Sequence, residues 1–252
     1  MKTKLLATFT IILLISTSCE KDEDTLIDSS SNNNSSTNTS SSTNTSSSTN
    51  STSISDKSSS SKDYYPLSIN NRWEYAGEVY FDDMATGDKM EYVDTIPGDT
   101  TIEGKLYYIV TNDGGGESFV RKSGSDYLMI NPMINSGDSK TQIVLKEDGE
   151  EGDEWGYEIS TTMYGYTTRN VYTFSIFEKL ESYEVNGTTY LDVLVMDGDT
   201  DTYLDNDVNP SMSLKDSRYY YAKGIGLIRS KVKQSYIDDH YMILDLISYK
   251  VN

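Results

Sequence analysis

The sequence is poor in residues that cross-link a chain or bind metals. Its 252 residues include one cysteine, one histidine and four prolines. A single cysteine cannot form a disulfide within the chain, so the fold has to be stable without one. One histidine and one cysteine also cannot supply the usual zinc ligands. His240 follows Asp238 and Asp239. Because neighbouring strand residues point to opposite faces, this group predicts no catalytic triad.

Positive charge is also scarce. Lys and Arg number 21 against 40 Asp and Glu, which gives a net charge of −19. Nucleic-acid binding depends on basic side chains that neutralise phosphates, so no nucleic-acid partner is expected. Direct docking on an anionic lipid surface is disfavoured for the same reason. Divalent cations, cationic groups and neutral glycans remain as partners for so acidic a protein.

The chain shows no sustained helical periodicity after its first residues, whereas alternation of period two is common. Residues 106–110, 190–195 and 241–246 alternate in this way, as half-buried strands do. The 21 tyrosines, against 5 Phe and 2 Trp, favour pleated surfaces. Asn186-Gly187 predicts a tight hairpin. We therefore predict an all-β, mostly antiparallel domain, built as a single curved sheet or half-barrel, or as a β-sandwich.

Two parts of the sequence echo each other. The stretch around Trp73 is similar to the stretch around Trp155, and each is followed by a turn glycine, Gly104 or Gly187. Later segments match only if the second half contains a long insertion, around residues 197–218. The pattern indicates two duplicated β-meanders, each opened by a tryptophan strand. Chance similarity among tyrosine-rich strands explains the same pattern, and the sequence leaves both interpretations open.

The N-terminus has the order of a secretory signal peptide. Lys2 and Lys4 precede an apolar run at residues 5–15 and three small residues at 16–18. The run is short for a bilayer core of ~30 Å, which needs ~20 apolar residues. Cys19 follows directly, which resembles a bacterial lipobox, although Ser16 stands where an aliphatic residue is usual. The resemblance implies removal of residues 1–18 and attachment of acyl chains such as palmitate to Cys19 as a membrane anchor.

Charged residues come immediately after this cysteine: Lys21, Asp22, Glu23 and Asp24. They resemble the lysine-plus-acidic signal of lipoproteins of the Bacteroidota type. The resemblance implies a lipoprotein in the outer membrane that faces the cell exterior.

A low-complexity segment separates the cysteine from the rest of the chain. Residues 29–61 are almost wholly Ser, Asn and Thr. Because such a segment has no apolar face to bury, we predict that residues 19–62 form a disordered tether. Its root-mean-square reach would be ~35 Å. Residues 63–252 are enough for one globular domain with a core of its own.

Two short motifs in this domain resemble those of the LolA/LolB-like envelope proteins. Residues 65–67 read Tyr-Pro-Leu ahead of Trp73, and residues 221–227 read Tyr-Ala-Lys-Gly-Ile-Gly-Leu. The resemblance implies a curved antiparallel sheet with an apolar concave face, which would carry an apolar ligand. Members of that group also have helices that plug the half-barrel, and the present sequence shows no pattern for them.

One acidic stretch has the composition of a calcium site. Its candidate ligands are Asp197, Asp199, Asp201 and Asp205. Oxygen ligands two residues apart on a turning loop suit Ca²⁺, which takes six to eight of them. The stretch is not an EF-hand, because Thr202 and Val208 stand where that motif has glycine and glutamate. A solvated acidic loop without metal is the simpler interpretation.

These observations favour a cell-surface lipoprotein with a non-catalytic β-rich domain for binding or structure, and no required cofactor. One alternative is a carbohydrate-binding or carbohydrate-active lipoprotein that uses exposed Tyr and Trp faces. A second alternative is a half-barrel carrier of an apolar ligand. An exposed row of aromatic rings would favour glycan binding, and a concave apolar face would favour an apolar ligand. Two convergent carboxylates ~5–9 Å apart would indicate a hydrolase.

Overall fold

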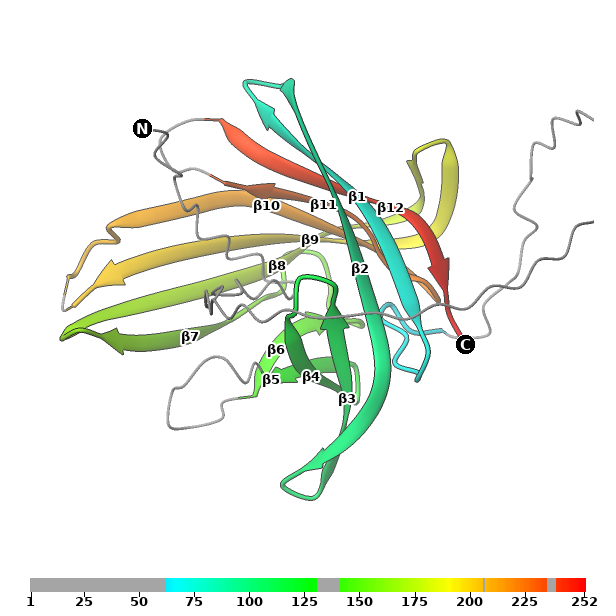
Figure 1. Cartoon of the computed structure of the whole chain (residues 1–252), viewed down its shortest axis with the longest axis horizontal. Helices are drawn as coiled ribbons and strands as arrows, with labels where there is room; N and C mark the ends of the chain where they lie inside the picture. The colour runs from blue at the N-terminus through cyan, green and yellow to red at the C-terminus, as the bar shows by residue number, and fades with distance from the viewer. Residues whose placement is uncertain (1–61, 131–140, 206, 235–238) are drawn as a thin grey trace, which may run out of the picture. The chain divides into compact units, whose positions relative to one another are not determined.

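The computed structural model describes residues 62–130, 141–205, 207–234 and 239–252. Within them all regular structure is β, and twelve strands form one antiparallel sheet (Figure 1). The strands are β1 (Arg72–Phe81), β2 (Met84–Ile102), β3 (Lys105–Asn112), β4 (Glu117–Ser123), β5 (Asp126–Ile130), β6 (Gln142–Lys146), β7 (Glu154–Met163), β8 (Tyr166–Val185), β9 (Thr188–Leu204), β10 (Met212–Ala222), β11 (Gly226–Lys233) and β12 (His240–Lys250). The predicted all-β antiparallel fold is confirmed. The predicted signal peptide and tether lie outside the described residues.

The sheet consists of two six-stranded meanders. Its strand order is β6-β5-β4-β3-β2-β1-β12-β11-β10-β9-β8-β7, so each half runs through neighbouring strands and the halves join where β1 pairs with β12. Trp73 lies on β1 and Trp155 on β7, the first strand of each half. The turns at Gly104 and Gly187 both connect the second strand of a half to its third. The two similar stretches of sequence therefore occupy the same strand positions in the two halves of the sheet.

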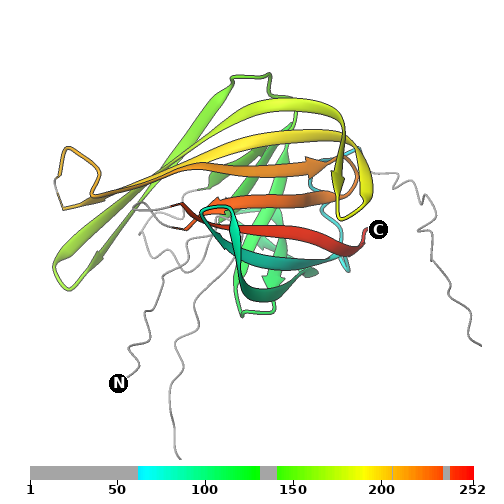
Figure 2. The same ribbon diagram turned by 90° about the horizontal axis from the view of Figure 1, so that it is seen from above.

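The sheet curls until its two edge strands approach each other, which nearly closes a barrel (Figure 2). The Trp155 Nε1–H on β7 donates a hydrogen bond to the backbone oxygen of Ile143 on β6, at 3.1 Å. The Lys146 ammonium of β6 lies 5.6 Å from the centre of the Trp155 ring. A side-chain hydrogen bond and a cation–π contact thus join the two edge strands. Among the described residues, no backbone ladder connects β6 with β7. None of these residues forms a helix long and apolar enough to span a membrane.

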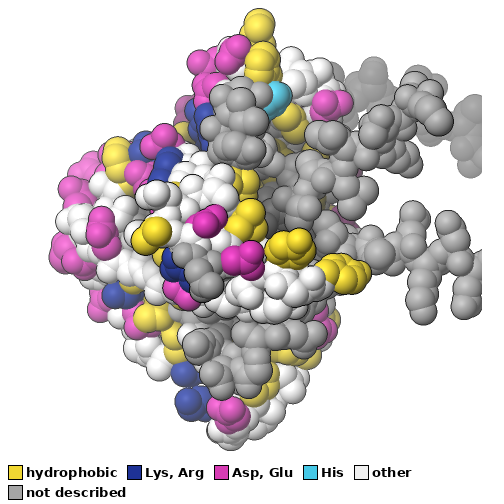
Figure 3. Space-filling model, turned by 90° about the vertical axis from the view of Figure 1, so that its left-hand side faces the viewer, with side chains coloured by type: hydrophobic (Ala, Val, Ile, Leu, Met, Phe, Trp, Pro, Cys, Tyr) yellow, Lys and Arg dark blue, Asp and Glu magenta, His cyan; other side chains and the backbone are white. Residues whose placement is uncertain are grey.

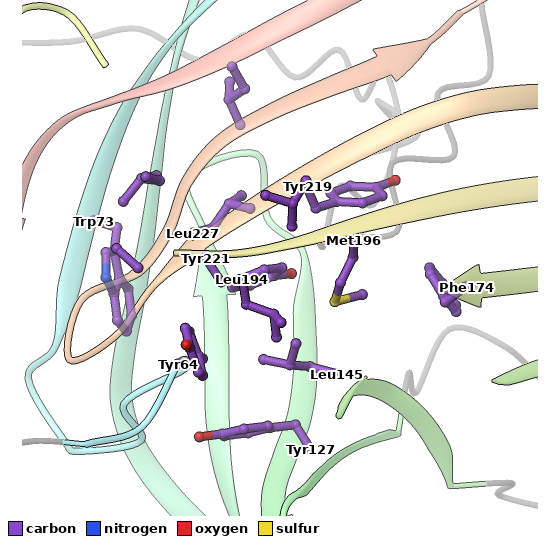
Figure 4. Packing of buried hydrophobic residues seen from close by; sticks show 14 of the residues in the cluster. Tyr64, Trp73, Tyr127, Leu145, Phe174, Leu194, Met196, Tyr219, Tyr221 and Leu227 are labelled. Carbon is purple, nitrogen blue, oxygen red and sulfur yellow. The ribbon is translucent and has the colours of Figure 1, made fainter. Parts of the chain in front are cut away.

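The core lies on the concave face of the sheet, where alternate residues of each strand point inward. Figure 4 shows this packing, with side chains from both halves facing one another. Labelled members that are almost completely buried are Trp73, Tyr127, Leu145, Phe174, Leu194, Met196 and Leu227. Gly198 makes room among them, because a Cβ at this position would lie 2.9 Å from Cε2 of Tyr219.

The segment before β1 closes one end of the curled sheet. The Asp63 carbonyl oxygen accepts a hydrogen bond from the Gly224 N–H at 2.8 Å, in the β10–β11 turn. Asn71 is fully buried, and its Nδ2–H donates to the Pro66 carbonyl oxygen at 2.9 Å. Its Oδ1 accepts from the backbone N–H of Asn252 at 2.9 Å. One asparagine therefore ties the start of the domain to the C-terminus.

Candidate functional site

The concave face is the largest apolar surface that the fold assembles. It combines aliphatic and aromatic side chains of both meanders in one continuous cluster. Eight strands are enough for a closed barrel whose interior side chains just fill it, and wider barrels enclose additional space. In this curled sheet of twelve strands the side chains of that cluster are almost completely buried.

A polar group interrupts this apolar surface near the closed end. Asp94 on β2 lies in register between Trp73 on β1 and Asn112 on β3. The exposed fraction is 9% for Asp94 and 8% for Asn112. Burial raises the pKa of the Asp94 carboxyl to about 7, and the nearby Asp113 carboxylate adds to the rise. This carboxyl therefore titrates near neutral pH, far above an ordinary aspartate.

Three buried tyrosines lie close enough to this carboxyl to be influenced by its charge. Burial raises the pKa of Tyr65, Tyr75 and Tyr221, and the negative charge of Asp94 contributes to the rise in each. The three hydroxyls therefore stay protonated and neutral. Tyr221 comes from β10, so this group joins the two halves across the interior. The ring of Tyr65 lies 5.9 Å from that of Trp73, at an interplanar angle of 42°.

A charged network borders this polar group. The Lys122 ammonium lies 2.7 Å from Oδ1 of Asp63 and 2.7 Å from Oε1 of Glu147. The Tyr127 hydroxyl donates to Oε2 of Glu147 at 2.9 Å. Burial alone would lower the pKa of Lys122, but its bonds to the two carboxylates outweigh burial and raise it. The network fastens the segment before β1 to β4 and β5.

The predicted calcium ligands occupy a strand, and the expected turning loop at this position is wrong. Asp197, Asp199 and Asp201 alternate along β9, where they point to one face. Arg218 donates to both oxygens of Asp197, at 2.6 and 3.1 Å. The Lys215 ammonium lies 3.3 Å from Asp199 and 3.0 Å from Asp201. Aspartates are poor strand formers, but basic side chains on β10 neutralise this row and let it extend the ladder.

Asp205 lies apart from this row, in the turn after β9. Its Oδ1 accepts a hydrogen bond from the Thr167 backbone N–H at 2.9 Å, at the start of β8. No group of three or more His, Cys, Asp or Glu side chains among the described residues is arranged to hold a metal ion. Calcium binding stays a prediction.

The other predicted site residues lie outside the described part of the chain. These are Cys19, Lys21, Asp22, Glu23 and Asp24. Asp94, in contrast, was not predicted as a site residue. One feature of the sequence could have indicated it. Asp94 stands midway between Tyr92 and Ile96 in an alternating strand, at a position where an apolar residue is usual.

Some aromatic rings of the convex face stack in pairs, whereas others, such as Tyr164 and Tyr166, are exposed. Tyr80 stacks on Tyr241 with ring centres 5.3 Å apart, and the Lys231 ammonium lies 3.8 Å from the centre of the Tyr241 ring. Tyr183 stacks on Tyr220 at 4.4 Å. Acidic side chains spread between hydrophobic and basic ones over the side of the molecule in Figure 3.

Comparison with known proteins gives similarity at the level of structure alone. No protein-family profile and no curated protein matches the chain. A protein described as exported, with a YmcC-like fold, from Bacteroides fragilis has 13% identity and a TM-score of 0.41, over 75% of this chain and 99% of its own. A protein described as a lipoprotein from Parabacteroides distasonis has 12% identity and a TM-score of 0.40, over 75% and 99%.

A LolA superfamily protein from Nitrosomonas europaea has 12% identity and a TM-score of 0.26, over 73% of this chain and 86% of its own. These three are of the kinds that the sequence motifs resemble. The function proposed below is inferred from this chain's own residues.

Proposed function

We propose that this protein is a lipid-anchored envelope protein whose domain binds an apolar ligand on its concave face, without catalysis. The observation that carries the proposal is the continuous apolar concave face of a twelve-stranded sheet whose edges nearly meet. Ligand sites are typically concave and apolar, with a few polar groups that fix the ligand's orientation. The buried group around Asp94 has the character of such an orienting element.

Binding can be tested with a neutral fluorescent apolar probe such as N-phenylnaphthylamine. Met196 lies on the concave face, packed near Tyr219 and Phe174 (Figure 4). Replacing Met196→Trp fills this part of the interior, and we expect probe binding to weaken about tenfold or more because the ligand loses its space. Leu191→Trp is the matched control, since Leu191 belongs to the same strand but is exposed. Equal probe affinity in the two variants, both folded by thermal melting, would contradict the proposal.

The proposed location has its own test. The residues after the proposed acyl anchor, Lys21 to Asp24, are expected to direct the protein to the cell surface. Replacing all four by alanine should leave a membrane-bound protein that protease added to intact cells no longer reaches. Unchanged proteolysis would show that the export signal lies elsewhere in the chain.

A further inference from the structure

One buried side-chain atom in the group around Asp94 lacks a hydrogen-bond partner. The Asn112 Oδ1 accepts a hydrogen bond from the Gly116 N–H at 2.9 Å. The Asn112 Nδ2, fully shielded, has no hydrogen-bond partner. Among the described residues, none donates a hydrogen bond to the Asp94 carboxyl either. The unpaired Nδ2 is costly, because a buried polar group that loses water without gaining a partner destabilises the fold.

The charge around Asp94 is negative. Asp113 lies close enough to influence its ionisation. Lys122, the ammonium of the bordering network, is already bonded to Asp63 and Glu147. The whole chain carries −19. A cationic group is therefore favoured at Asp94, and an anionic one is repelled.

Aromatic faces adjoin the carboxyl. Trp73 is its cross-strand neighbour on β1, and Tyr65 packs against Trp73. Aromatic faces attract ammonium groups, tryptophan most strongly, and the attraction grows when water is excluded. A buried carboxylate beside tryptophan and tyrosine rings thus has the composition of a site for a protonated amine.

The site also borders solvent on one side. The β3–β4 turn follows Asn112 directly, and Asp113, Gly114 and Gly115 in it are exposed. Gly115 has a φ of +84°, which a glycine adopts without strain. This exposed turn, which follows Asn112 in the chain, is where a head group would enter.

We infer that Asp94 binds the protonated amine of an amphipathic ligand whose apolar body lies on the concave face. The Asn112 Nδ2–H would donate to an oxygen carried next to that amine. This inference rests on the proposed function, and it adds the chemical class of the ligand: an apolar chain with an ammonium head.

The test compares three probes of equal chain length, dodecylammonium, dodecanol and dodecanoate, each below its micelle-forming concentration. Each competes with N-phenylnaphthylamine for the full-length wild-type protein. We expect dodecylammonium to bind roughly ten- to a hundredfold more tightly than dodecanol, because a charge-assisted hydrogen bond is about twice as strong as a neutral one. Dodecanoate should bind most weakly. An equal affinity for all three, or a preference for dodecanoate, would overturn the inference.

Two variants locate the effect. Asp94→Asn keeps the size of the side chain and removes its charge, so the preference for the ammonium over the alcohol should disappear. Asp207→Asn removes one charge from an exposed position after β9, and the preference should remain. Loss of the preference in both variants would mean that net charge, not Asp94, selects the amine. The ranking of the three probes is measured on the wild-type protein, so it does not depend on whether a variant folds.

Binding of the neutral probe reports the proposed function separately. If the neutral probe binds and the ranking fails, only the inference is wrong.

Discussion

The indole N–H of Trp155 on β7 donates to the backbone oxygen of Ile143 on β6, and this bond links the two edges of the sheet. Every other strand junction is a backbone ladder. Among the described residues, the hydrogen bond and the cation–π contact across this seam both involve the Trp155 side chain, which faces the Lys146 ammonium. Trp155 also stacks on Phe174 of β8, with ring centres 5.8 Å apart. This contact holds the Trp155 ring against the neighbouring strand.

Trp155→Phe should keep an aromatic ring but lose the seam bond and part of the buried indole. We expect the free energy of unfolding to fall by at least about 1 kcal/mol, the typical net value of one hydrogen bond, because the smaller ring also loses packing. Hydrogen exchange should quicken at the amides of β6 and β7. Tyr164→Phe, at the exposed β7–β8 tip, is the control and should change the free energy by less than about 0.5 kcal/mol. Equal urea denaturation curves for both variants and wild type would show that the seam bond contributes nothing.

Asp94 should make the ligand-free protein less stable as the pH rises. Its pKa is about 7 when folded and about 3.9 when unfolded. The folded state therefore holds this proton more tightly, and the resulting stability is present below about pH 4 and is lost as the pH rises through 7. Asp94→Asn removes the effect.

Relative to Asp94→Asn, the wild-type free energy of unfolding should fall by about 2 to 3 kcal/mol between pH 5 and pH 8. Comparison with the variant cancels the contributions of the other carboxylates, including Asp201, whose pKa is lowered. A difference between the two proteins that does not change with pH would contradict the buried, unpartnered position of Asp94.

The acidic row on β9 should show no selectivity for calcium in the wild type. Lys215 neutralises Asp199 and Asp201, so melting temperatures in Ca²⁺, Mg²⁺ and EDTA should agree. Lys215→Ala leaves both aspartates without that cation, and divalent cations should then raise the melting temperature by roughly 2 °C or more. Lys105→Ala on β3 is the control. A wild-type shift in Ca²⁺ alone, abolished by Asp199→Ala, would establish the calcium site.

Cys19 should be the point of lipid attachment. Cys19→Ala is expected to abolish labelling by an acyl precursor and to move the protein from the membrane fraction to the soluble fraction, because the anchor supplies the membrane affinity. Ser30→Ala, in the predicted tether, should alter neither result. If Cys19→Ala still fractionates with the membrane, another part of the chain holds it there.

The strands could be predicted from the sequence where alternation was regular. Residues 106–110 and 190–195 lie in β3 and β9, and Asn186-Gly187 forms the β8–β9 turn as predicted. Both turn residues have positive φ, 51° and 77°, which is the conformation that this dipeptide favours.

The acidic row and the polar group could not be predicted in the same way. Repeated aspartates are poor strand formers, and Asp197 to Asp201 extend β9 only because Lys215 and Arg218 face them from β10. Alternation also fails where the ladder is irregular: Leu191 is exposed and Val193 is buried, and Asp192 between them has a positive φ of 52°. Asp94 became a candidate only when the curl of the sheet placed it among Trp73, Tyr75 and Tyr221.

The first and last strands of the domain pair with each other, and Asn71 holds the terminal residue Asn252. Each meander can form hairpin by hairpin from contacts that are local in the sequence, which is fast. The β1–β12 pairing spans nearly the whole domain, and closing so long a loop carries the largest entropy cost in the sheet. We therefore expect the two halves to join last, so that the interior closes only once β12 has paired with β1.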